Sequence, residues 1–583
     1  MNDIRGRLLA VLIALAIIAT ACGGGSTTAE PEAGGADAGA EGSGGDTDGS
    51  EDGASGGDSA VDESADGSDV ASAAETEVTT GGTLRIGLQT EADTLNPTNT
   101  ALNRAPTLVA TAIFDTLVVI DVDGNWQNNL SESWTPSEDL MSWEMTLREG
   151  INFSDGEPLN ADAVIRSVEA FFNDPLVSLV FAPAFDPETP VERIDDLTVR
   201  FNARTPNAQI PFYFAEQVGM IGSPLWLDAR DNDPSLDQFP VGAGPYVITE
   251  RTQDQLTVLE RNENYWNTEQ APNLDRIELF ADQIATQRVD SLLLDELDIT
   301  HVTEAQAILG LRDEGDAVNR LEDQAGEEFL FLMNAQVAPF DDIRVREAAT
   351  LAFPQAEYAE FITDGTANPA ETLFSDETIW FVPGLEQADD QPEAAIPLVA
   401  AYCADVPDQC TDGRVDIEFQ HDISDELTRT ATIIGDAWSD LFNLDVQVVP
   451  NDQHITEVTL GAYDVATWRF HGFADPDIDG IFFECSTIGA LSVNFARNCN
   501  AERDALIAEQ RATTDFDERY AIWEEIQLNL RDTFQYINIE HTNWVVGSAP
   551  NVGGICDATS PDGAVLPCQF SGVFRLPQLF LTN

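Results

Sequence analysis

Histidine, serine and lysine are the residues from which catalytic or metal chemistry is first expected. No two of the five histidines have the H-E-x-x-H spacing of a zinc protease; they are His301, His421, His454, His471 and His541. The nucleophile pattern G-x-S-x-G occurs at residues 53–57, but it works only between a strand and a helix, and neither is predicted there. Lysine is absent, which excludes a P-loop and Schiff-base catalysis. The sequence therefore predicts no enzyme, no catalytic residue and no cofactor.

One acidic run has the spacing of a metal-binding loop. Asp475, Asp477 and Asp479, followed by Gly480, match the first half of the EF-hand pattern D-x-D-x-D-G. The twelfth position of that loop is normally glutamate but here is Ser486, and a proline occupies the second position. The run therefore predicts no calcium site, and no other metal site is predicted.

The first cysteine follows an export signal. Two arginines precede an unbroken apolar run at residues 8–18, which has the length of a signal segment and not of a membrane span. The sequence Ala19-Thr20-Ala21-Cys22 resembles a bacterial lipobox. This resemblance implies that residues 1–21 are removed and that Cys22 carries lipid; the alternative is an ordinary signal peptide with a chance cysteine. No other apolar run suggests a transmembrane helix.

The remaining six cysteines lie in three sequential pairs. No C-x-x-C motif is present, so zinc and thioredoxin-like chemistry are not favoured. Proximity along the chain predicts the disulfides Cys403–Cys410, Cys485–Cys499 and Cys556–Cys568. Other connectivities remain open, because six cysteines allow about 15 of them.

The charge of the chain restricts which partners it can bind, and the composition of residues 22–80 sets this segment apart from the rest. The chain has 27 basic and 104 acidic residues, a formal net charge of −77. A protein this acidic is not expected to bind nucleic acid or an anionic membrane surface, because charges of the same sign repel each other. Residues 22–80 are rich in Gly, Ala, Ser and acids and lack aromatic residues. They predict a disordered tether, because they cannot bury enough surface to fold. The acidity of the rest predicts a body stabilised by salt.

The elements beyond residue 80 predict a mixed α/β protein. Alternating apolar residues at 84–88 and 143–147 indicate strands, and residues 118–124 indicate a strand that ends in a turn. Asn160 is a predicted helix cap, as is Asp341 or Asp342. An amphipathic helix is predicted around residues 520–530.

Several segments, in order, resemble the family 5 extracellular solute-binding proteins, the dipeptide and oligopeptide receptors of ABC importers. They are GGTLRIGLQTEADTLNP at 81–97, IFDTLVVIDVDG at 113–124, WEMTLREGINFSDGEPLNADAVIRSVEAF at 143–171, VGAGPYVI at 241–248, LERNENYW at 259–266, PNLDRIELF at 272–280, PFDDIRVREAATLAF at 339–353, ADPD at 474–477 and DERYAIWEEIQ at 517–527. Each segment alone is weak, but their order and spacing together are specific. The resemblance covers nearly all of residues 81–583.

The resemblance implies a bilobed periplasmic-binding-protein fold (type II, cluster C) with a small extra domain. Lobe I would comprise residues 81–124, 241–329 and 545–583, the small domain 125–240, and lobe II 330–544. A monomer anchored outside the cell membrane by lipid alone would capture a small molecule or a peptide between the lobes. It would deliver this solute to an ABC permease and thus, indirectly, to a cytoplasmic ATPase. The alternatives are a receptor for an oligosaccharide or a metal chelate, a surface hydrolase, and a structural lipoprotein.

The resemblance also implies that the strand before Asp475 lines the cleft. In family members that bind peptides, this strand pairs with the peptide backbone, and an aspartate three residues before the Asp-Pro pair holds the α-ammonium group. Gly472 stands at that position. Backbone pairing is therefore expected without this anchor, so that a free peptide amino terminus is not required; Asp475 is the nearest carboxylate in sequence that can replace it. The expected ligand-binding residues are Trp468, Arg469, Phe470, His471, Gly472, Phe473 and Asp475, with Asn99 and Thr100.

Overall fold

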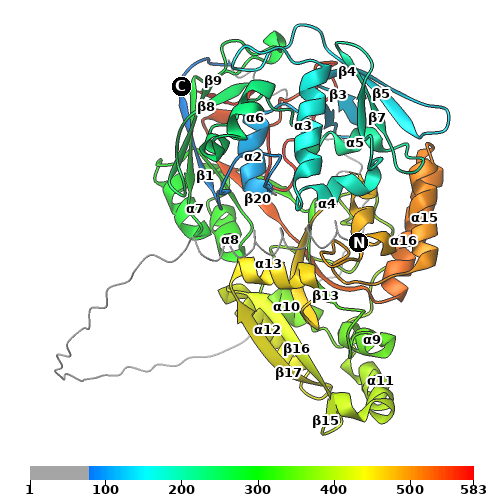
Figure 1. Ribbon diagram of the computed structural model, residues 1–583. Helices are drawn as coiled ribbons and strands as arrows, with labels where there is room; N and C mark the ends of the chain where they lie inside the picture. Colours follow the sequence, from blue (N-terminus) through cyan, green and yellow to red (C-terminus); the bar gives the residue numbers. More distant parts are fainter. Residues whose placement is uncertain (1–77, 101, 474, 583) are drawn as a thin grey trace, which may run out of the picture. The chain divides into compact units, whose positions relative to one another are not determined.

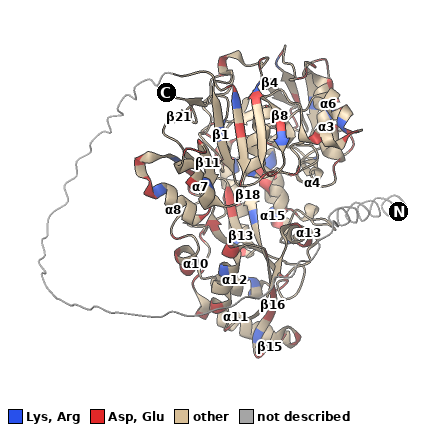
Figure 2. Ribbon diagram, turned by 90° about the vertical axis from the view of Figure 1, so that its left-hand side faces the viewer, with Lys and Arg blue, Asp and Glu red and all other residues tan. Residues whose placement is uncertain are grey.

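The computed structural model describes residues 78–582 except 101 and 474, and these belong to one compact unit. The predicted signal segment, Cys22 and nearly all of the predicted tether lie outside the described residues. Within the described chain, every helix is too short or too polar to span a bilayer. Acidic residues, red in Figure 2, are spread over all parts of this unit.

The first large sheet, sheet I, has seven strands and is assembled from distant parts of the chain. Its order is β12-β20-β11-β1-β10-β9-β8. The strands are β12 (Asn319–Asp323), β20 (Trp544–Ser548), β11 (Ile299–Val302), β1 (Thr83–Leu88), β10 (Arg276–Ala281), β9 (Leu256–Arg261) and β8 (Tyr246–Thr252). β1 is parallel to both of its neighbours, whereas β20 is antiparallel to β11 and β12. β20, which comes from the last 40 residues of the chain, therefore lies inside the sheet, between two strands formed by residues 299–302 and 319–323.

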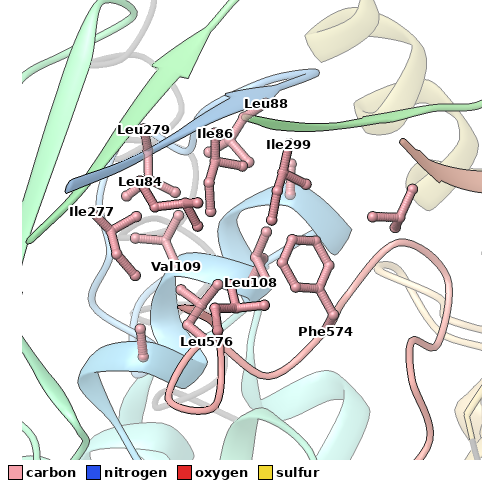
Figure 3. Close-up of a cluster of buried hydrophobic side chains, with 14 of the residues drawn as sticks. Leu84, Ile86, Leu88, Leu108, Val109, Ile277, Leu279, Ile299, Phe574 and Leu576 are labelled. Atoms are coloured by element: carbon pink, nitrogen blue, oxygen red, sulfur yellow. The ribbon is translucent and has the colours of Figure 1, made fainter. Parts of the chain in front are cut away.

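Helices cover both faces of sheet I. Alternation along β1 sends Leu84, Ile86 and Leu88 to one face, where they pack with α2 (Arg104–Ile113) and the C-terminal segment (Figure 3). Gly87 faces the other side, where a Cβ atom would lie within 3.5 Å of Leu297, Thr300 and Arg288. That second face is covered by α7 (Ala285–Leu293) and α8 (Ala305–Asp313), which Figure 1 shows beside the sheet.

The second large sheet, sheet II, follows the path β14-β19-β13-β18-β16-β15, with β17 paired to β16. Its strands are β14 (Asn368–Pro369), β19 (Tyr536–His541), β13 (Glu327–Met333), β18 (Val465–His471), β16 (Arg414–Asp422), β15 (Cys410–Thr411) and β17 (Phe442–Val449). Phe329 and Phe331 pack on one face against residues of α9 (Ile343–Leu351), α11 (Pro392–Asp405) and α12 (Asp425–Ala437). Leu330 and Leu332 pack on the other face. That face is covered by α13 (Asn451–Leu460), α15 (Ala501–Ala512) and α16 (Phe516–Asp532).

A third, four-stranded sheet has the order β4-β5-β7-β6. It consists of β4 (Ser131–Pro136), β5 (Ser142–Leu147), β7 (Thr198–Asn202) and β6 (Val191–Arg193), after the hairpin β2 (Val118–Ile120) and β3 (Trp126–Asn128). The helices α3 (Ala161–Asn173), α4 (Ser178–Phe181), α5 (Ile210–Tyr213) and α6 (Pro224–Arg230) lie in the same part of the chain. The predicted cap is present, because Asn160 accepts a hydrogen bond from the Ala163 amide.

Two strands pass from sheet I into sheet II side by side. β12 ends at Asp323 and β13 begins at Glu327, while β19 ends at His541 and β20 begins at Trp544. The pairs run antiparallel in both sheets, with Asp323 opposite Trp544 and Glu328 opposite His541. We call the place where these strands cross between the sheets the seam. It comprises residues 323–328 and 541–544, together with Arg104, Gly472 and Ser571, which contact them.

The three predicted disulfides, Cys403–Cys410, Cys485–Cys499 and Cys556–Cys568, are all present, which confirms the pairing by proximity. The predicted strands at 84–88, 118–122 and 143–147 are confirmed as β1, β2 and β5, although β2 ends earlier, at Ile120. Asp342 is the cap of α9. The predicted domain boundaries remain a prediction.

Candidate functional site

The pleat of β18 divides the predicted ligand-binding residues between two faces of sheet II. Trp468 and Phe470 point to the face that carries Leu330. Phe470 is only 4% exposed, and its ring stacks on Phe482 at a centroid distance of 4.7 Å. Trp468 is half-buried against Phe495. Phe470 is therefore enclosed by aromatic side chains, and its ligand-binding role stays a prediction.

Arg469 lies on the opposite face within a group of carboxylates. Its guanidinium is 3.2 Å from Glu327, 3.7 Å from Glu426 and 3.7 Å from Glu540, and it donates to the Thr542 hydroxyl at 2.7 Å. Burial alone would lower the pKa of Arg469, but these carboxylates outweigh burial and raise it. The Arg469 side chain keeps 34% of its surface accessible, so this group of charges is only partly enclosed by protein.

The backbone of Gly326 occupies the space that a side chain at position 472 would need. A Cβ atom on Gly472 would lie 2.7 Å from the carbonyl oxygen of Gly326, so no side chain fits there without a backbone shift. Asp475 is 1% exposed, and its two oxygens each accept a hydrogen bond of 2.6 Å from Arg519. The carboxylate of Asp475 is thus fully engaged, which argues against its replacing the missing aspartate.

Phe473, Asn99 and Thr100 each contact segments outside β18. Phe473 is half-buried and packs against the cores on both sides of the β18 end. Asn99 donates to Asp237 at 2.9 Å, and the Thr100 carbonyl accepts from Gln217 at 2.7 Å. His471 belongs to β18 through its backbone, while its side chain lies outside the described part of the structure.

Arg104, which the sequence did not single out, joins elements of both sheets. It is the first residue of α2 and is 7% exposed. Its Nη2 donates to the carbonyl oxygens of Gly472, after β18, and of Gly326, before β13. The guanidinium carbon lies 5.2 Å from the ring centroid of Phe570 in the C-terminal segment. One cation thus contacts three separate segments of the chain.

Four acidic side chains interact with Arg104. Burial raises the pKa of Glu216, Asp323, Glu328 and Asp479, and the positive charge of Arg104 opposes the rise in each case. For Glu328, burial and then the neighbouring Glu327 raise the pKa to about 8. For Asp479 the rise is larger, because Glu328, Asp475 and Glu216 add their repulsion to burial. This region holds more carboxyl groups than cations.

Buried polar atoms without a protein partner gather at and around the seam. Ordinarily, buried polar groups are hydrogen-bonded, and each exception calls for an explanation. Ser571 belongs to the seam because a Cβ on Gly326 would lie 2.2 Å from its hydroxyl oxygen. The unpartnered atoms here are Arg104 Nε, Asp479 Oδ2, His541 Nδ1, Asn543 Oδ1, Trp544 Nε1 and Ser571 Oγ. They come from both sheets and the segments beside them, so a molecule bound here would satisfy groups from both.

Asp477 forms a second, fully paired centre. Its carboxylate accepts hydrogen bonds from Asn207 (2.9 Å) and Tyr213 (3.0 Å), near the third sheet, and from Gln510 (2.6 Å) and Arg511 (2.7 Å) on α15. Because Asp475 and Asp477 are committed to arginines, the acidic run does not present an open calcium loop. Across the described chain, no group of three or more acidic, histidine or cysteine side chains is placed to hold a metal ion.

Sequence reasoning missed Arg104 and Glu328, which lie in no motif, and it considered Asp479 only as part of the acidic run at 475–480 and not as a ligand-binding residue. Glu328 is the second of two acids that open the strand EEFLFLM, and its position in the alternation is that of Leu330 and Leu332, where an acid facing the core is unusual. That local contrast was the one available signal. Arg104 offered none, since it is one of 27 basic residues.

Comparisons with known proteins agree on the family. The model of bacterial extracellular solute-binding proteins, family 5 (middle), matches residues 125–485. The nickel-binding periplasmic protein of Escherichia coli K12 is 24% identical over 503 residues, 83% of this chain and 92% of that protein. Di/tripeptide-binding protein 2 of Pseudomonas aeruginosa UCBPP-PA14 is 24% identical over 455 residues, 73% of this chain and 83% of that protein.

A solved structure gives the same fold. The periplasmic binding protein DppA of Helicobacter pylori, in complex with the peptide STSA, superposes with a TM-score of 0.74 at 18% identity, covering 87% of this chain and 99% of that one. The predicted bilobed α/β fold is therefore confirmed. The match of the family model over more than half of the sequence shows that the chain belongs to the bacterial extracellular solute-binding proteins of family 5.

Proposed function

We propose that the protein is the extracytoplasmic substrate-binding component of an ABC importer. It captures a small solute, a peptide in the first instance, between lobe I and lobe II at the seam. The observation that carries this proposal is the group of buried, unpartnered polar atoms contributed by both sheets and the segments beside them. A bound solute supplies the missing partners and links the lobes, so it favours one arrangement of them.

The relatives support a receptor without fixing its ligand. One is named for nickel and another for di- and tripeptides, and the structural neighbour holds a peptide. A receptor for a non-peptide solute such as a metal chelate is the second candidate. It is favoured by Gly472, where the packed Gly326 backbone leaves no room for the aspartate that peptide-binding members use.

Delivery follows from the proposed attachment outside the membrane. Lipid on Cys22 and the tether at 22–80 hold a monomer near its permease, which raises the effective concentration of the loaded receptor. The lobes proposed at 81–124 with 241–329 and 545–583, and at 330–544, close around the solute, and the permease recognises the closed form. No catalysis is involved in this cycle.

Native mass spectrometry of the full chain purified from its own host tests the proposal. We expect an additional small mass that leaves on denaturation, and a thermal shift when yeast extract is added to protein freed of that mass. Arg104→Gln should weaken both effects, whereas Arg276→Gln, a change on β10 at a partly exposed side chain, should not. Protein that carries no mass and shows no thermal shift would contradict the proposal.

A further inference from the structure

The surroundings of Arg104 are short of positive charge. Within the described chain, Arg104 forms no ion pair; its guanidinium donates hydrogen bonds to the carbonyl oxygens of Gly326 and Gly472. Glu328 is 5% exposed, and its side-chain carboxyl forms no hydrogen bond or ion pair with another described residue. Buried carboxylates are normally paired with a cation or neutralised by a proton. Here the single guanidinium of Arg104 is the shared counter-charge of several carboxyl groups.

Asp479 is a buried acid near which negative charges outnumber positive ones. It is 6% exposed, and its Oδ2 has no hydrogen-bond partner among the described residues. Its charged neighbours are Glu328, Asp475 and Glu216, which repel it, and Arg104, which attracts it. Asp475 already pairs with Arg519. The unpartnered oxygen of Asp479 and the unpaired carboxyl of Glu328 therefore belong to one acidic region, in which Arg104 is the one described cation that acts on both groups and forms an ion pair with neither.

We propose that the solute carries a positively charged nitrogen group, a protonated amine or a guanidinium, that is held by Glu328 and Asp479 at the seam. This inference rests on the proposed function and names the chemical class of its solute. An amine or guanidinium brings several N–H donors, and hydrogen bonds between charged partners are the strong ones. Its donors can supply the partner that Asp479 Oδ2 lacks, and its positive charge offsets the excess of carboxyl groups around Arg104.

The arrangement fits an organic cation better than a bare metal ion. A hard cation needs about six oxygen ligands converging at short distance. Here the acids come from separate elements, with Glu216 after α5, Glu328 on β13 and Asp479 at the end of α14 (Pro476–Asp479). No metal-holding group of three or more such side chains is found among the residues described. A nitrogen cation on a larger solute tolerates such a spread, because its donors point in different directions.

The proposed contact lies close to position 472, where this protein has glycine and peptide-binding family members have an aspartate. Glu328 pairs across the sheet with Phe470, two residues before Gly472. The carboxylates of the seam thus lie close along the strands to the position where peptide-binding members carry their aspartate. The expectation drawn from Gly472 alone, that no amine is anchored, therefore applies only to that position.

Isosteric neutral variants test the inference with little risk to the fold. Glu328→Gln and Asp479→Asn keep the size and hydrogen-bonding capacity of the side chain but remove its charge. Because the folded protein already disfavours that charge, both variants should fold. Glu357→Gln on α10 (Gln355–Phe361), an exposed acid in the same sheet region, is the matched control. Circular dichroism and the melting curve without additive verify that each variant is folded.

The probe is yeast extract separated on a cation exchanger at about pH 2, where carboxyl groups are protonated and solutes with a basic nitrogen are retained as cations. The retained fraction and the flow-through fraction are both neutralised before use. We expect the retained fraction alone to raise the melting temperature of the full chain freed of bound solute. The amount that gives half of the maximal shift should increase about tenfold or more in Glu328→Gln and Asp479→Asn, and stay unchanged in Glu357→Gln.

The outcomes separate the two proposals. A shift caused by the flow-through fraction, or an unchanged response of both Glu328→Gln and Asp479→Asn, overturns the cationic solute while the receptor function stands. If neither fraction acts and the protein from its host carries no bound mass, the receptor function itself fails. If the host protein carries a bound mass, tandem mass spectrometry decides directly, because a solute without a basic nitrogen contradicts the inference.

Discussion

Neutralising Glu328 should change how the stability of the protein depends on pH. Burial and the adjacent Glu327 raise the pKa of Glu328 from the ordinary 4.5 to about 8 in the folded protein. Arg104 opposes this rise only in part, and His541, opposite Glu328 on β19, adds no charge at neutral pH because burial lowers its pKa to about 4. In the unfolded chain Glu328 ionises with its ordinary pKa.

The direction and size of the effect follow from these two values. Below pH 4.5 Glu328 is protonated in both states and does not affect the pH dependence. As the pH rises from 4.5 to 8, the unfolded chain loses the proton and the folded protein keeps it, so the free energy of unfolding falls. Each pKa unit corresponds to about 1.36 kcal/mol. The full difference is therefore on the order of 5 kcal/mol, complete above pH 8.

Urea unfolding followed by tryptophan fluorescence at pH 5, 6, 7, 8 and 9 measures this dependence. Glu328→Gln cannot titrate, so its stability relative to the wild type should be near zero at pH 5 and should grow by about 1.4 kcal/mol per pH unit up to pH 8. Glu357→Gln, which removes an exposed carboxylate, is the reference for loss of one surface charge. If the curves of Glu328→Gln and the wild type run parallel, Glu328 is not the buried, unpaired acid described above.

Three further changes have expected results. Gly472→Asp should destabilise the protein by about 1–3 kcal/mol, because its Cβ meets the Gly326 carbonyl at 2.7 Å. Gly435→Asp on α12, where the nearest atom to the new Cβ is 3.9 Å away, is the control and should lower the free energy of unfolding by less in the same urea titration. Equal losses in the two variants would contradict the packing argument. Tyr213→Phe removes a donor to the buried Asp477 carboxylate and should cost about 1.5–3 kcal/mol. Tyr520→Phe, whose hydroxyl binds the neutral Phe381 carbonyl, should cost about 0.5–1.5 kcal/mol, and a reversed order would refute the role of charge. The melting temperature should rise from low to molar salt, because salt screens a formal net charge of −77; a flat or falling calorimetric trend would remove that idea.

The sequence was most informative where local chemistry decides the structure. Alternation predicted β1, side-chain capping predicted the starts of α3 and α9, and chain proximity predicted all three disulfides. These features depend on neighbours within a few residues. The order of strands in sheet I, where residues 83–88, 299–302 and 544–548 lie together, depends on distant contacts and was available only through resemblance to a family.

The candidate site shows the same limit. Gly472 was found because a family position could be matched, but the reason that no side chain fits there is Gly326, which is far away in sequence. The expected ligand-binding run, residues 468–473, was treated as one surface, whereas the pleat places Phe470 in an aromatic core and Arg469 among carboxylates on the other side. Arg104 and Asp479 gain their meaning only from partners brought together by the fold.

The place of β20 in sheet I has a consequence for the order in which the chain is made. Because β20 separates β11 from β12, the ribosome must add residues 544–548 before this sheet can be completed. Until then β11 presents an open edge and β12 lacks its partner, and such edges attract other chains. A chain whose N-terminal lobe cannot finish folding before its C-terminal end emerges stays extended for longer. Late completion of sheet I would therefore suit the proposed export through a channel that accepts only unfolded protein.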